Sequence, residues 1–474
     1  MIKHRTMEQA YDKTSKWSIL DYSKKLLGKT LEEAIAPKQI QELRGKGRLG
    51  QLVEKYFFGY DINSNQEADF SEAGLELKCT PLKELTNKAM AIKERLVLTM
   101  IDYSEDYKKP FEESHLHLKC MYMLILFYLH KSGVPVHKLT FIYSILWQIP
   151  EKDLLIIRQD YKTIIEKIKS GKAHELSEGD TTYLGACRKG QKGDADVFYM
   201  LPNGKQSDTP APKRAFSLKT QYMRTILEFA KKSGGNGSYN TSAIVSGYAP
   251  QLVTSQELED KSFEEILINR FKAYYGLTYN ELIQLLGCEN TTAKSKYFLI
   301  TNEILTEKGA RGIDVTKSEE FKKSGIVIKT IRLKQNGKSA EAMSFENINY
   351  FDVMKEDDWY DSRLYEIFTG RFLFVVFQEN EKDTVFLKKA FFWTMPVNDL
   401  KIAEGYWENI RRNILDNHIS SEYFYKTSDK KKFHVRPKAK NAADVTKNPN
   451  GGTAKKYCYW FNKDYINEII NAKQ

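Results

Sequence analysis

The chain has 474 residues, more than one ordinary domain holds, so two or three domains are expected. Hydrophobic residues make up 41% of it and aromatic residues 12%, enough to fill cores of normal size, which excludes general disorder. Lysine and arginine number 73 against 62 aspartates and glutamates, a formal net charge of +11 that favours a polyanionic partner. The five cysteines form no C-x-x-C pair, which argues against a zinc finger or a disulfide framework and fits a reducing compartment.

No segment is typical of a signal peptide or a membrane span. The first five residues (Met-Ile-Lys-His-Arg) contain no apolar core. The longest apolar run, residues 120–129, is about half as long as a helix that spans a bilayer. We therefore expect a cytoplasmic protein without a membrane partner.

Helical and strand-like patterns alternate along the chain. Residues 49–58 carry apolar side chains at helical spacing, and the pattern ends at Gly59. Residues 74–80 alternate like a strand, and residues 119–129 form an apolar run that predicts a buried strand. A second helix is predicted over residues 153–168, where apolar side chains form one stripe. Interleaved helices and strands indicate a mixed sheet with flanking helices.

The second half of the chain repeats the first. A Ser-Gly-Gly-Asn-Gly-Ser cluster at residues 233–238 lies close to the midpoint and is typical of a linker. Three segments recur in the same order at a nearly constant offset: 74–78 as 325–329, 147–154 as 393–400, and 213–222 as 456–465. We predict two copies of one fold, over residues 1–235 and 255–474, joined by a linker at 236–254.

Three side chains around residue 76 have the spacing of a hydrolytic metal site. Side chains of a strand alternate between its faces, so Glu76 and Lys78 share one face. Asp69, just upstream on a turn or a preceding strand, can bring a second carboxylate to Glu76. Two carboxylates suit Mg²⁺, and a neighbouring lysine can position or deprotonate an attacking water. The spacing D-x6-E-x-K also fits an ordinary solvated strand face, so both interpretations are open on this pattern alone.

The second copy differs at the same place. Val327 stands where the first copy has Glu76, and Lys329 is retained. Glu320 stands where the first copy has Asp69. Because an aliphatic side chain cannot bind a cation, we predict that the second copy has lost any metal site that the first copy holds.

Several motifs together resemble the MutH family of GATC endonucleases. Residues 46–54 show the pattern K-G-x-x-G-x-L-x-E, and D-x6-E-x-K follows at residues 69–78. Residues 114–119 resemble the family's S-H-x-x-x-K. The family's later DNA-contacting segments have similar segments at 172–176 and 214–219. The family's R-P-K-A-x-N-A occurs at residues 436–442, in the second copy, whereas residues 183–189 of the first copy match it more loosely.

The doubled length, with a degenerate second copy, is similar to the two-domain, GATC-cutting type II restriction enzymes of the Sau type. The resemblance implies an α/β (α+β) protein of two tandem copies of a restriction-endonuclease-like, PD-(D/E)xK fold. Each copy would have a mixed central sheet flanked by helices. The first copy would be the catalytic domain, and the second a catalytically degenerate DNA-binding or regulatory domain.

The resemblance also implies a role for single residues. Asp69 and Glu76 would be ligands of Mg²⁺, Lys78 the catalytic lysine, Lys119 a second active-site lysine, and Glu54 a further acid near the metal or its waters. Contacts with double-stranded DNA would involve Lys46, Gly47, Arg188, Lys189, Lys219, Arg436 and Lys438.

The function that the resemblance implies is Mg²⁺-dependent hydrolysis of DNA at 5'-GATC-3', with the cut before the guanine and a 5'-phosphate on the product. A DNA methyltransferase would be encoded nearby. One intact site for a palindrome with two strands predicts a homodimer on DNA, a second DNA site or successive nicks. Two alternatives remain. A mismatch-repair GATC nickase would resemble one copy alone, and a non-catalytic DNA-binding regulatory protein would leave the acidic and basic site residues unexplained.

Overall fold

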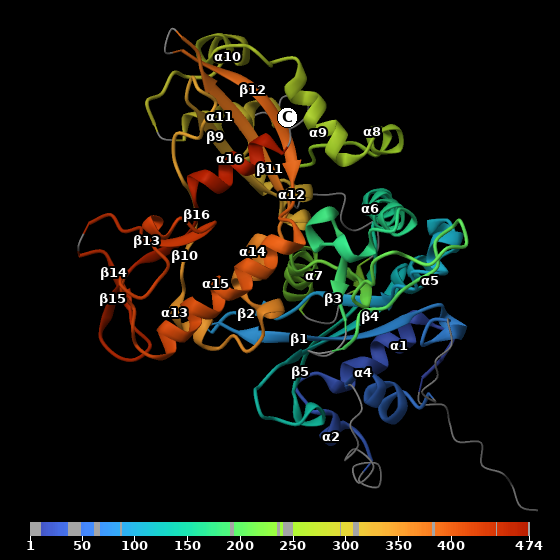
Figure 1. The fold of residues 1–474 in the computed structure, drawn as a ribbon. Helices are drawn as coiled ribbons and strands as arrows, with labels where there is room; N and C mark the ends of the chain where they lie inside the picture. The colour runs from blue at the N-terminus through green and yellow to red at the C-terminus, as the bar shows by residue number, and fades with distance from the viewer. Residues whose placement is uncertain are drawn as a thin grey trace, which may run out of the picture. The chain divides into compact units, whose positions relative to one another are not determined.

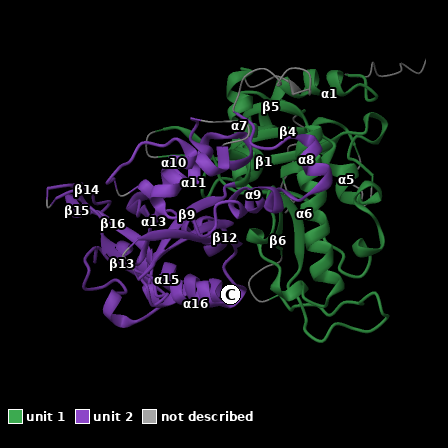
Figure 2. Ribbon diagram, turned by 90° about the horizontal axis from the view of Figure 1, so that it is seen from above, with its two compact units in different colours: residues 1–248, 322–324 green, residues 249–321, 325–474 purple. Residues whose placement is uncertain are grey.

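The computed structural model describes residues 11–36, 49–60, 67–85, 88–189, 194–234, 238–239, 250–293, 295–306, 312–381, 384–441 and 443–472. The chain divides into two compact units, Met1–Tyr248 with Lys322–Ser324, and Ala249–Phe321 with Gly325–Gln474 (Figure 2). The predicted roles of the two halves, catalytic and degenerate, remain predictions.

A five-stranded mixed sheet lies at the centre of unit 1 (Figure 1). Its order is β2-β1-β4-β5-β8, with β1 at Glu76–Glu84, β2 at Met90–Ile92, β4 at Tyr122–Leu129, β5 at Phe141–Gln148 and β8 at Ser238–Tyr239. β1 runs parallel to β4, and β4 pairs antiparallel with β5. β4 is a nearly continuous apolar run because helices cover both of its faces.

Helices from the N-terminal and the C-terminal part of unit 1 cover this sheet. Leu124 and Leu126 of β4 share one apolar cluster with residues of α1 (Lys16–Ser23) and α4 (Leu49–Leu52). On the other face, Trp147 of β5 contacts Phe229 of α7 (Thr220–Lys232), with ring centroids 5.8 Å apart. The other helices in the described part of unit 1 are α2 (Leu31–Ala34), α5 (His115–Cys120) and α6 (Glu151–Lys169).

A smaller antiparallel sheet completes unit 1. Its order is β3-β7-β6, with β3 at Leu96–Met100, β6 at Leu184–Arg188 and β7 at Arg214–Leu218. Tyr161 of α6 contacts Phe216 of β7, with ring centroids 5.5 Å apart. This sheet therefore packs against α6.

Unit 2 repeats the same plan. Its first sheet has the order β12-β11-β9, with β9 (Val327–Leu333) parallel to β11 (Phe372–Glu379) and β11 antiparallel to β12 (Val385–Trp393). Its second sheet has the order β10-β16-β13, with strands at Met343–Asn347, Tyr457–Phe461 and Phe433–Pro437. A separate hairpin joins β14 (Val445–Lys447) to β15 (Thr453–Lys455).

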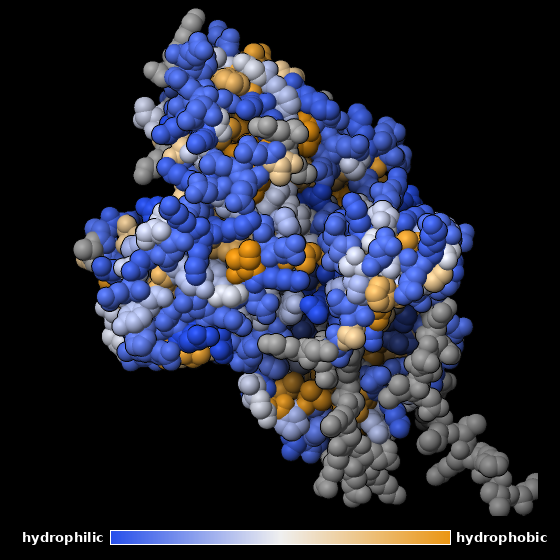
Figure 3. Space-filling model, in the orientation of Figure 1, coloured by the Kyte–Doolittle hydropathy of each residue, from blue (hydrophilic) through white to orange (hydrophobic). Residues whose placement is uncertain are grey.

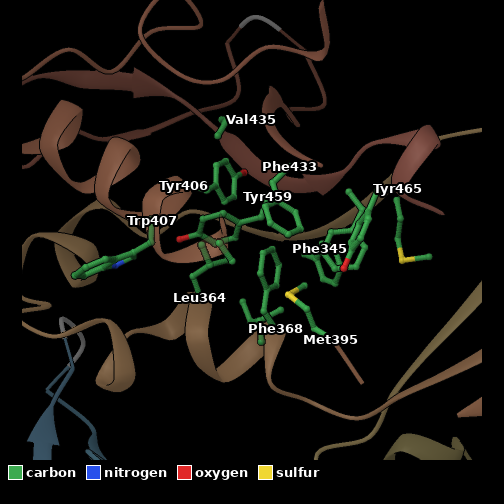
Figure 4. Packing of buried hydrophobic residues seen from close by; sticks show 14 of the residues in the cluster. Phe345, Leu364, Phe368, Met395, Tyr406, Trp407, Phe433, Val435, Tyr459 and Tyr465 are labelled. Carbon is green, nitrogen blue, oxygen red and sulfur yellow. The ribbon is translucent and has the colours of Figure 1, made fainter. Parts of the chain in front are cut away.

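The helices of the second half are α8 (Ser255–Asp260), α9 (Phe263–Lys272), α10 (Tyr279–Leu286), α11 (Lys296–Thr306), α12 (Glu319–Ser324), α13 (Tyr350–Met354), α14 (Arg363–Phe368), α15 (Val397–Leu415) and α16 (Lys463–Asn471). Aromatic side chains fill the core of unit 2 (Figure 4). Phe433 lies at its centre, with ring centroids 5.0 Å from Phe368 and 5.6 Å from Tyr406.

The two units share topology as well as sequence. α6 and α15 both have 19 residues, and each follows a proline, Pro150 or Pro396. β1, β4 and β5 of unit 1 correspond in order and direction to β9, β11 and β12 of unit 2. The prediction of two tandem copies of a mixed-sheet fold flanked by helices is confirmed.

The structure differs from the sequence prediction at residues 119–129. The predicted strand starts at Tyr122, because the preceding residues form the helix α5. Ser114 caps this helix by accepting a hydrogen bond from His117 N, and Leu116 and Cys120 are buried four residues apart. The predicted helix over residues 49–58 is present as α4 followed by a π-helical turn, Val53–Phe57.

Apolar side chains on the surface are few and scattered. Figure 3 shows a mainly hydrophilic face with apolar residues in small separate groups. Across the parts of the chain that the structure describes, no helix combines the length and apolar character needed to cross a membrane.

Candidate active site

The turn before β1 brings Asp69 next to Glu76. Gly74 takes a left-handed conformation (φ 58°), which glycine adopts at little cost and which ends the turn Ser71–Ala73. The chain then folds back so that Asp69 Oδ2 accepts a hydrogen bond from Leu77 N at 2.9 Å. Two carboxylates seven positions apart therefore lie at the start of one strand.

Glu76 is buried between two lysines. It is only 2% exposed. Lys78 Nζ, two residues along the strand, donates to Glu76 Oε1 at 2.7 Å and to the carbonyl of Leu98 at 3.1 Å. Lys119 Nζ donates to Oε1 at 3.2 Å and to Oε2 at 3.3 Å. Lys119 lies on α5, which leads into β4, and Glu76 pairs with Met123 of that strand.

Glu54 is a third acid of the same cluster. It lies in the π-helical turn after α4 and is 8% exposed. Burial, and after it the charges of Asp69 and Glu76, raise its pKa to about 7 against an opposing effect of Lys119. Burial, and then the charge of Glu76, also raise the pKa of Asp69. Three carboxylates that repel one another in a poorly solvated place are characteristic of functional sites.

The acids of this cluster fit a divalent cation. Mg²⁺ is commonly held by one or two carboxylates together with waters and substrate phosphate, and Asp69 with Glu76 could supply the carboxylates. A cation beside them would lower the raised pKa values, because it favours the ionised form of each acid. No group of three His, Cys, Asp or Glu side chains arranged for a metal ion occurs within the described residues.

The predicted DNA-contacting residues of the first copy differ in their exposure to solvent. Lys46 and Gly47 lie outside the described residues. Arg188 ends β6 and is exposed, and Lys189 follows it and is half-buried. Lys219 is 8% exposed, and its amine donates to the carbonyl of Thr181. The contact of Lys219 with DNA stays a prediction, and it would require the amine to leave this carbonyl.

The predicted DNA-contacting residues of the second copy lie at the end of β13. Arg436 is exposed, and its guanidinium lies over the ring of Trp460, 4.8 Å from the centroid. Lys438 is exposed, and its amine donates to Ser344 Oγ at 3.1 Å and to the carbonyl of Phe345 at 3.0 Å.

Strand pairing shows that Lys189 and Lys438 are equivalent residues, where the sequence motifs matched only weakly. Lys189 N donates to the carbonyl of Lys213, and Lys438 N donates to the carbonyl of Lys456. Since residues 213–222 and 456–465 are repeats of one another, Lys189 and Lys438 occupy the same place in the two units.

The second copy also lacks a counterpart of Lys119, which the sequence motifs did not reveal. Ser362 caps α14 as Ser114 caps α5, by accepting from the backbone N–H three residues later. The fifth residue of α5 is Lys119, and that of α14 is Ile367, which is part of the core. A serine five positions before each of these residues is the signal that could have found the substitution.

Comparison with known proteins agrees with this architecture. Residues 58–160 match the family model of the DNA mismatch repair enzyme MutH. The chain is 30% identical to the type II restriction enzyme Sau3AI of Staphylococcus aureus, over 97% of this chain and 96% of that protein. It is 28% identical to the DNA mismatch repair protein MutH of Shewanella woodyi, over 40% of this chain and 78% of that protein. For MutH of Vibrio vulnificus the identity is 26%, over 43% of this chain and 86% of that protein. The chain therefore belongs to the MutH-like family of DNA endonucleases, in the full-length form represented by the type II restriction enzyme Sau3AI.

Proposed function

We propose that this protein is a type II restriction endonuclease that cuts double-stranded DNA at 5'-GATC-3', before the guanine, and leaves a 5'-phosphate, with Mg²⁺ as its cofactor. The observation that carries the proposal is the buried Glu76 held by Lys78 and Lys119 beside two further acids. It occurs in a chain that matches a type II restriction enzyme over nearly its whole length. The base sequence rests on the resemblance of the motifs at residues 46–54 and 69–78.

Asp69 and Glu76 are the proposed ligands of Mg²⁺, which when bound supplies Lewis-acid polarisation of the scissile phosphate. Lys78 is within hydrogen-bond reach of Glu76, so its amine can orient the attacking water and offset the charge that develops on the phosphate. Lys119 supplies a second positive charge on the other side of the same carboxylate. Glu54, the third acid of the cluster, is proposed to accept hydrogen bonds from the waters of the bound cation.

Only unit 1 is proposed to cut DNA. Unit 2 has Val327 in place of Glu76 and Ile367 in place of Lys119, so it lacks two groups of the proposed site. Its proposed role is to bind DNA or regulate unit 1. Cutting both strands of a palindrome then requires two chains on the DNA, a second DNA site or two successive nicks. A methyltransferase encoded nearby would protect the host's own sites.

Digestion of a supercoiled plasmid with several GATC sites in Mg²⁺ tests the proposal. The wild-type protein is expected to give linear fragments, and run-off sequencing of their ends is expected to place each cut before the guanine. Lys78→Ala is expected to lower the rate at least about 100-fold, because it removes the amine beside the reacting phosphate. Lys83→Ala is the matched control, since it removes a lysine from the opposite face of the same strand.

Each other outcome has a definite meaning. Normal digestion by the Lys78→Ala protein would show that the site is assigned wrongly. Open circles that never become linear would indicate the mismatch-repair type of nickase. Tight DNA binding without any cleavage would indicate a regulatory DNA-binding protein.

A further inference from the structure

The place in unit 2 that corresponds to the candidate active site has kept one lysine and lost its acid. β9 pairs with β11 as β1 pairs with β4, in parallel, and Lys329 occupies the position of Lys78. Lys78 reaches the carbonyl of Leu98 on β3, and Lys329 reaches the carbonyl of Ser344 on the equivalent strand β10, at 2.6 Å. The difference is that Lys78 also binds a carboxylate, whereas Lys329 has Val327 two residues before it.

A second amine, that of Lys438, contacts the same part of β10. Lys438, just after β13, donates to Ser344 Oγ at 3.1 Å and to the carbonyl of Phe345 at 3.0 Å. Lys329 donates to the carbonyl of Ser344, and its amine lies 4.6 Å from the centre of the Phe345 ring. Both amines are thus bound to the same two residues of β10. We call this pair, Lys329 and Lys438, the lysine pair.

Among the described residues, no acid neutralises the lysine pair. No described carboxylate lies within ion-pair distance of either amine. Glu346, the nearest acid on β10, is bound by Arg363 through two hydrogen bonds of 2.8 and 2.7 Å. Cys458 also faces the pair, but its thiol is uncharged, since burial raises its pKa. Burial, and then the charge of Lys438, lower the pKa of Lys329 to about 8. An anion would stabilise two like charges that contact the same two residues.

We propose that Lys329 and Lys438 together bind one phosphate group of duplex DNA, at the place where unit 1 would use a metal ion, so that DNA binding by unit 2 requires no divalent cation. This inference rests on the proposed function, because it takes DNA as the ligand. In unit 1 the acids Asp69, Glu76 and Glu54 would repel a phosphate unless a cation lay between them. In unit 2 the amines can contact the phosphate directly.

The surroundings of the lysine pair favour a polymer of phosphates over a single small anion. Arg436, two residues before Lys438, is exposed and lies over Trp460. Trp460 in turn pairs with Ser344, the residue that both amines contact. The cationic side chains therefore continue from the pair across β16 to Arg436 on β13, as contact with successive phosphates would require.

Binding of the full-length protein to a fluorescent GATC duplex in EDTA tests the proposal. Lys329→Gln and Lys438→Gln are each expected to weaken binding about 10-fold and to reduce the slope of log affinity against log salt by about one. The double variant is expected to bind about as weakly as either single variant, because both amines serve one phosphate. Lys401→Gln, an exposed lysine of α15, is the control and is expected to change nothing. Competition by 10 mM inorganic phosphate that abolishes duplex binding would show a small-anion site and overturn the choice of DNA.

Two results would overturn the lysine pair as a clamp on one phosphate. Unchanged affinity of the single variants would show that neither amine contacts DNA. A loss of about 100-fold in the double variant would show two separate phosphates, because independent contacts multiply. These results are distinguishable from failure of the proposed function, in which the wild-type protein would neither bind nor cut GATC DNA in Mg²⁺.

A substitution at Val327 provides a test that leaves both lysines in place. Val327→Glu would restore the acid of unit 1 beside Lys329 and is expected to weaken binding in EDTA about 10-fold, because the carboxylate would occupy the amine. Val327→Gln has the same size without the charge and is expected to bind within about twofold of wild type. Equal affinity of both variants, with unchanged thermal unfolding, would contradict the proposal.

Discussion

The start of β1 and the start of β9 are the same piece of architecture with different contents. Both strands follow a glycine in the left-handed conformation, Gly74 or Gly325, and both pair in parallel with the next long strand. At the first strand Glu76 is buried between two lysines, and at the second Val327 stands in place of the acid and Lys329 donates to the carbonyl of Ser344. The same fold therefore forms with or without the candidate site, because the chemistry depends on a few side chains that the fold carries.

The second acids of the two units show the same contrast. Asp69 accepts a hydrogen bond at the start of β1 and takes part in the acidic cluster. Glu320, its counterpart in the sequence, is 1% exposed and accepts hydrogen bonds from the backbone N–H groups of Leu252 and Val253. An acid at this position thus belongs to the candidate active site in one half and accepts backbone hydrogen bonds in the other.

The strongest way to break the comparison is to make unit 1 resemble unit 2. Glu76→Val is expected to lower the rate of plasmid cleavage in Mg²⁺ at least about 1,000-fold, because it removes a proposed metal ligand and leaves Lys78 and Lys119 without their carboxylate. The rate is measured with saturating DNA. Cleavage at the wild-type rate in ordinary Mg²⁺ would contradict the role of Glu76 in the site.

A second comparison replaces the fifth residue of α5 and the fifth residue of α14 by alanine. Lys119→Ala is expected to lower cleavage about 100-fold, because Lys119 contacts Glu76. Ile367→Ala is expected to leave cleavage within about threefold but to lower the free energy of unfolding by about 2 kcal/mol, since Ile367 is a core residue. Urea titrations and plasmid assays on both variants separate the two effects. A large loss of cleavage in Ile367→Ala would mean that unit 2 takes part in the chemistry.

The caps of these two helices give a smaller and more selective effect. Ser114→Ala and Ser362→Ala are each expected to lower the free energy of unfolding by about 1 kcal/mol, because each removes the acceptor for a backbone N–H at a helix start. Only Ser114→Ala is expected also to slow cleavage, by less than about 10-fold, since α5 positions Lys119. Equal slowing by both variants would show a general effect of lost stability.

The response to pH sharpens the electrostatic difference between the units. The pKa of Glu54 is raised to about 7 from 4.5, so the folded protein holds this proton more tightly than the unfolded chain. The stabilisation of the folded state by protonated Glu54 is complete below about pH 4.5 and is lost as the pH rises through 7. Without divalent cations, Glu54→Gln is expected to reduce the loss of stability between pH 5 and 8, by on the order of 0.5–1 kcal/mol. An identical pH dependence in wild type and variant would show that Glu54 titrates normally.

Lys329 is expected to act in the opposite direction. Its pKa is lowered from 10.5 to about 8, so the unfolded chain holds the proton more tightly. The folded state therefore gains stability as the pH rises from 8 towards 10.5. Thermal unfolding of wild type and Lys329→Gln between pH 7.5 and 10 is expected to show a difference of a few degrees that narrows as the pH rises. A constant difference would mean that Lys329 keeps its ordinary pKa.

Local patterns predicted the long elements well. The helix expected over residues 153–168 is Glu151–Lys169, because 16 residues of one apolar stripe leave little ambiguity. The six-residue helix α5 was predicted as part of a strand, since a segment of less than two turns shows no clear period. Lys219, for which we predict a contact with DNA, is buried, and no local signal tells whether a strand-end lysine is exposed or buried.

What the sequence alone determined is the duplication, the interleaved helices and strands, and the loss of one carboxylate from the second copy. Each of these depends on residues close together in the chain or on a repeated pattern. Only the tertiary structure decided that Lys119 reaches Glu76 across 43 positions, and that Lys438 reaches Ser344 across 94. The physical reason is that such contacts depend on which strands pair and in what register, and the burial of both faces of the sheet, not the spacing of residues, selects that register.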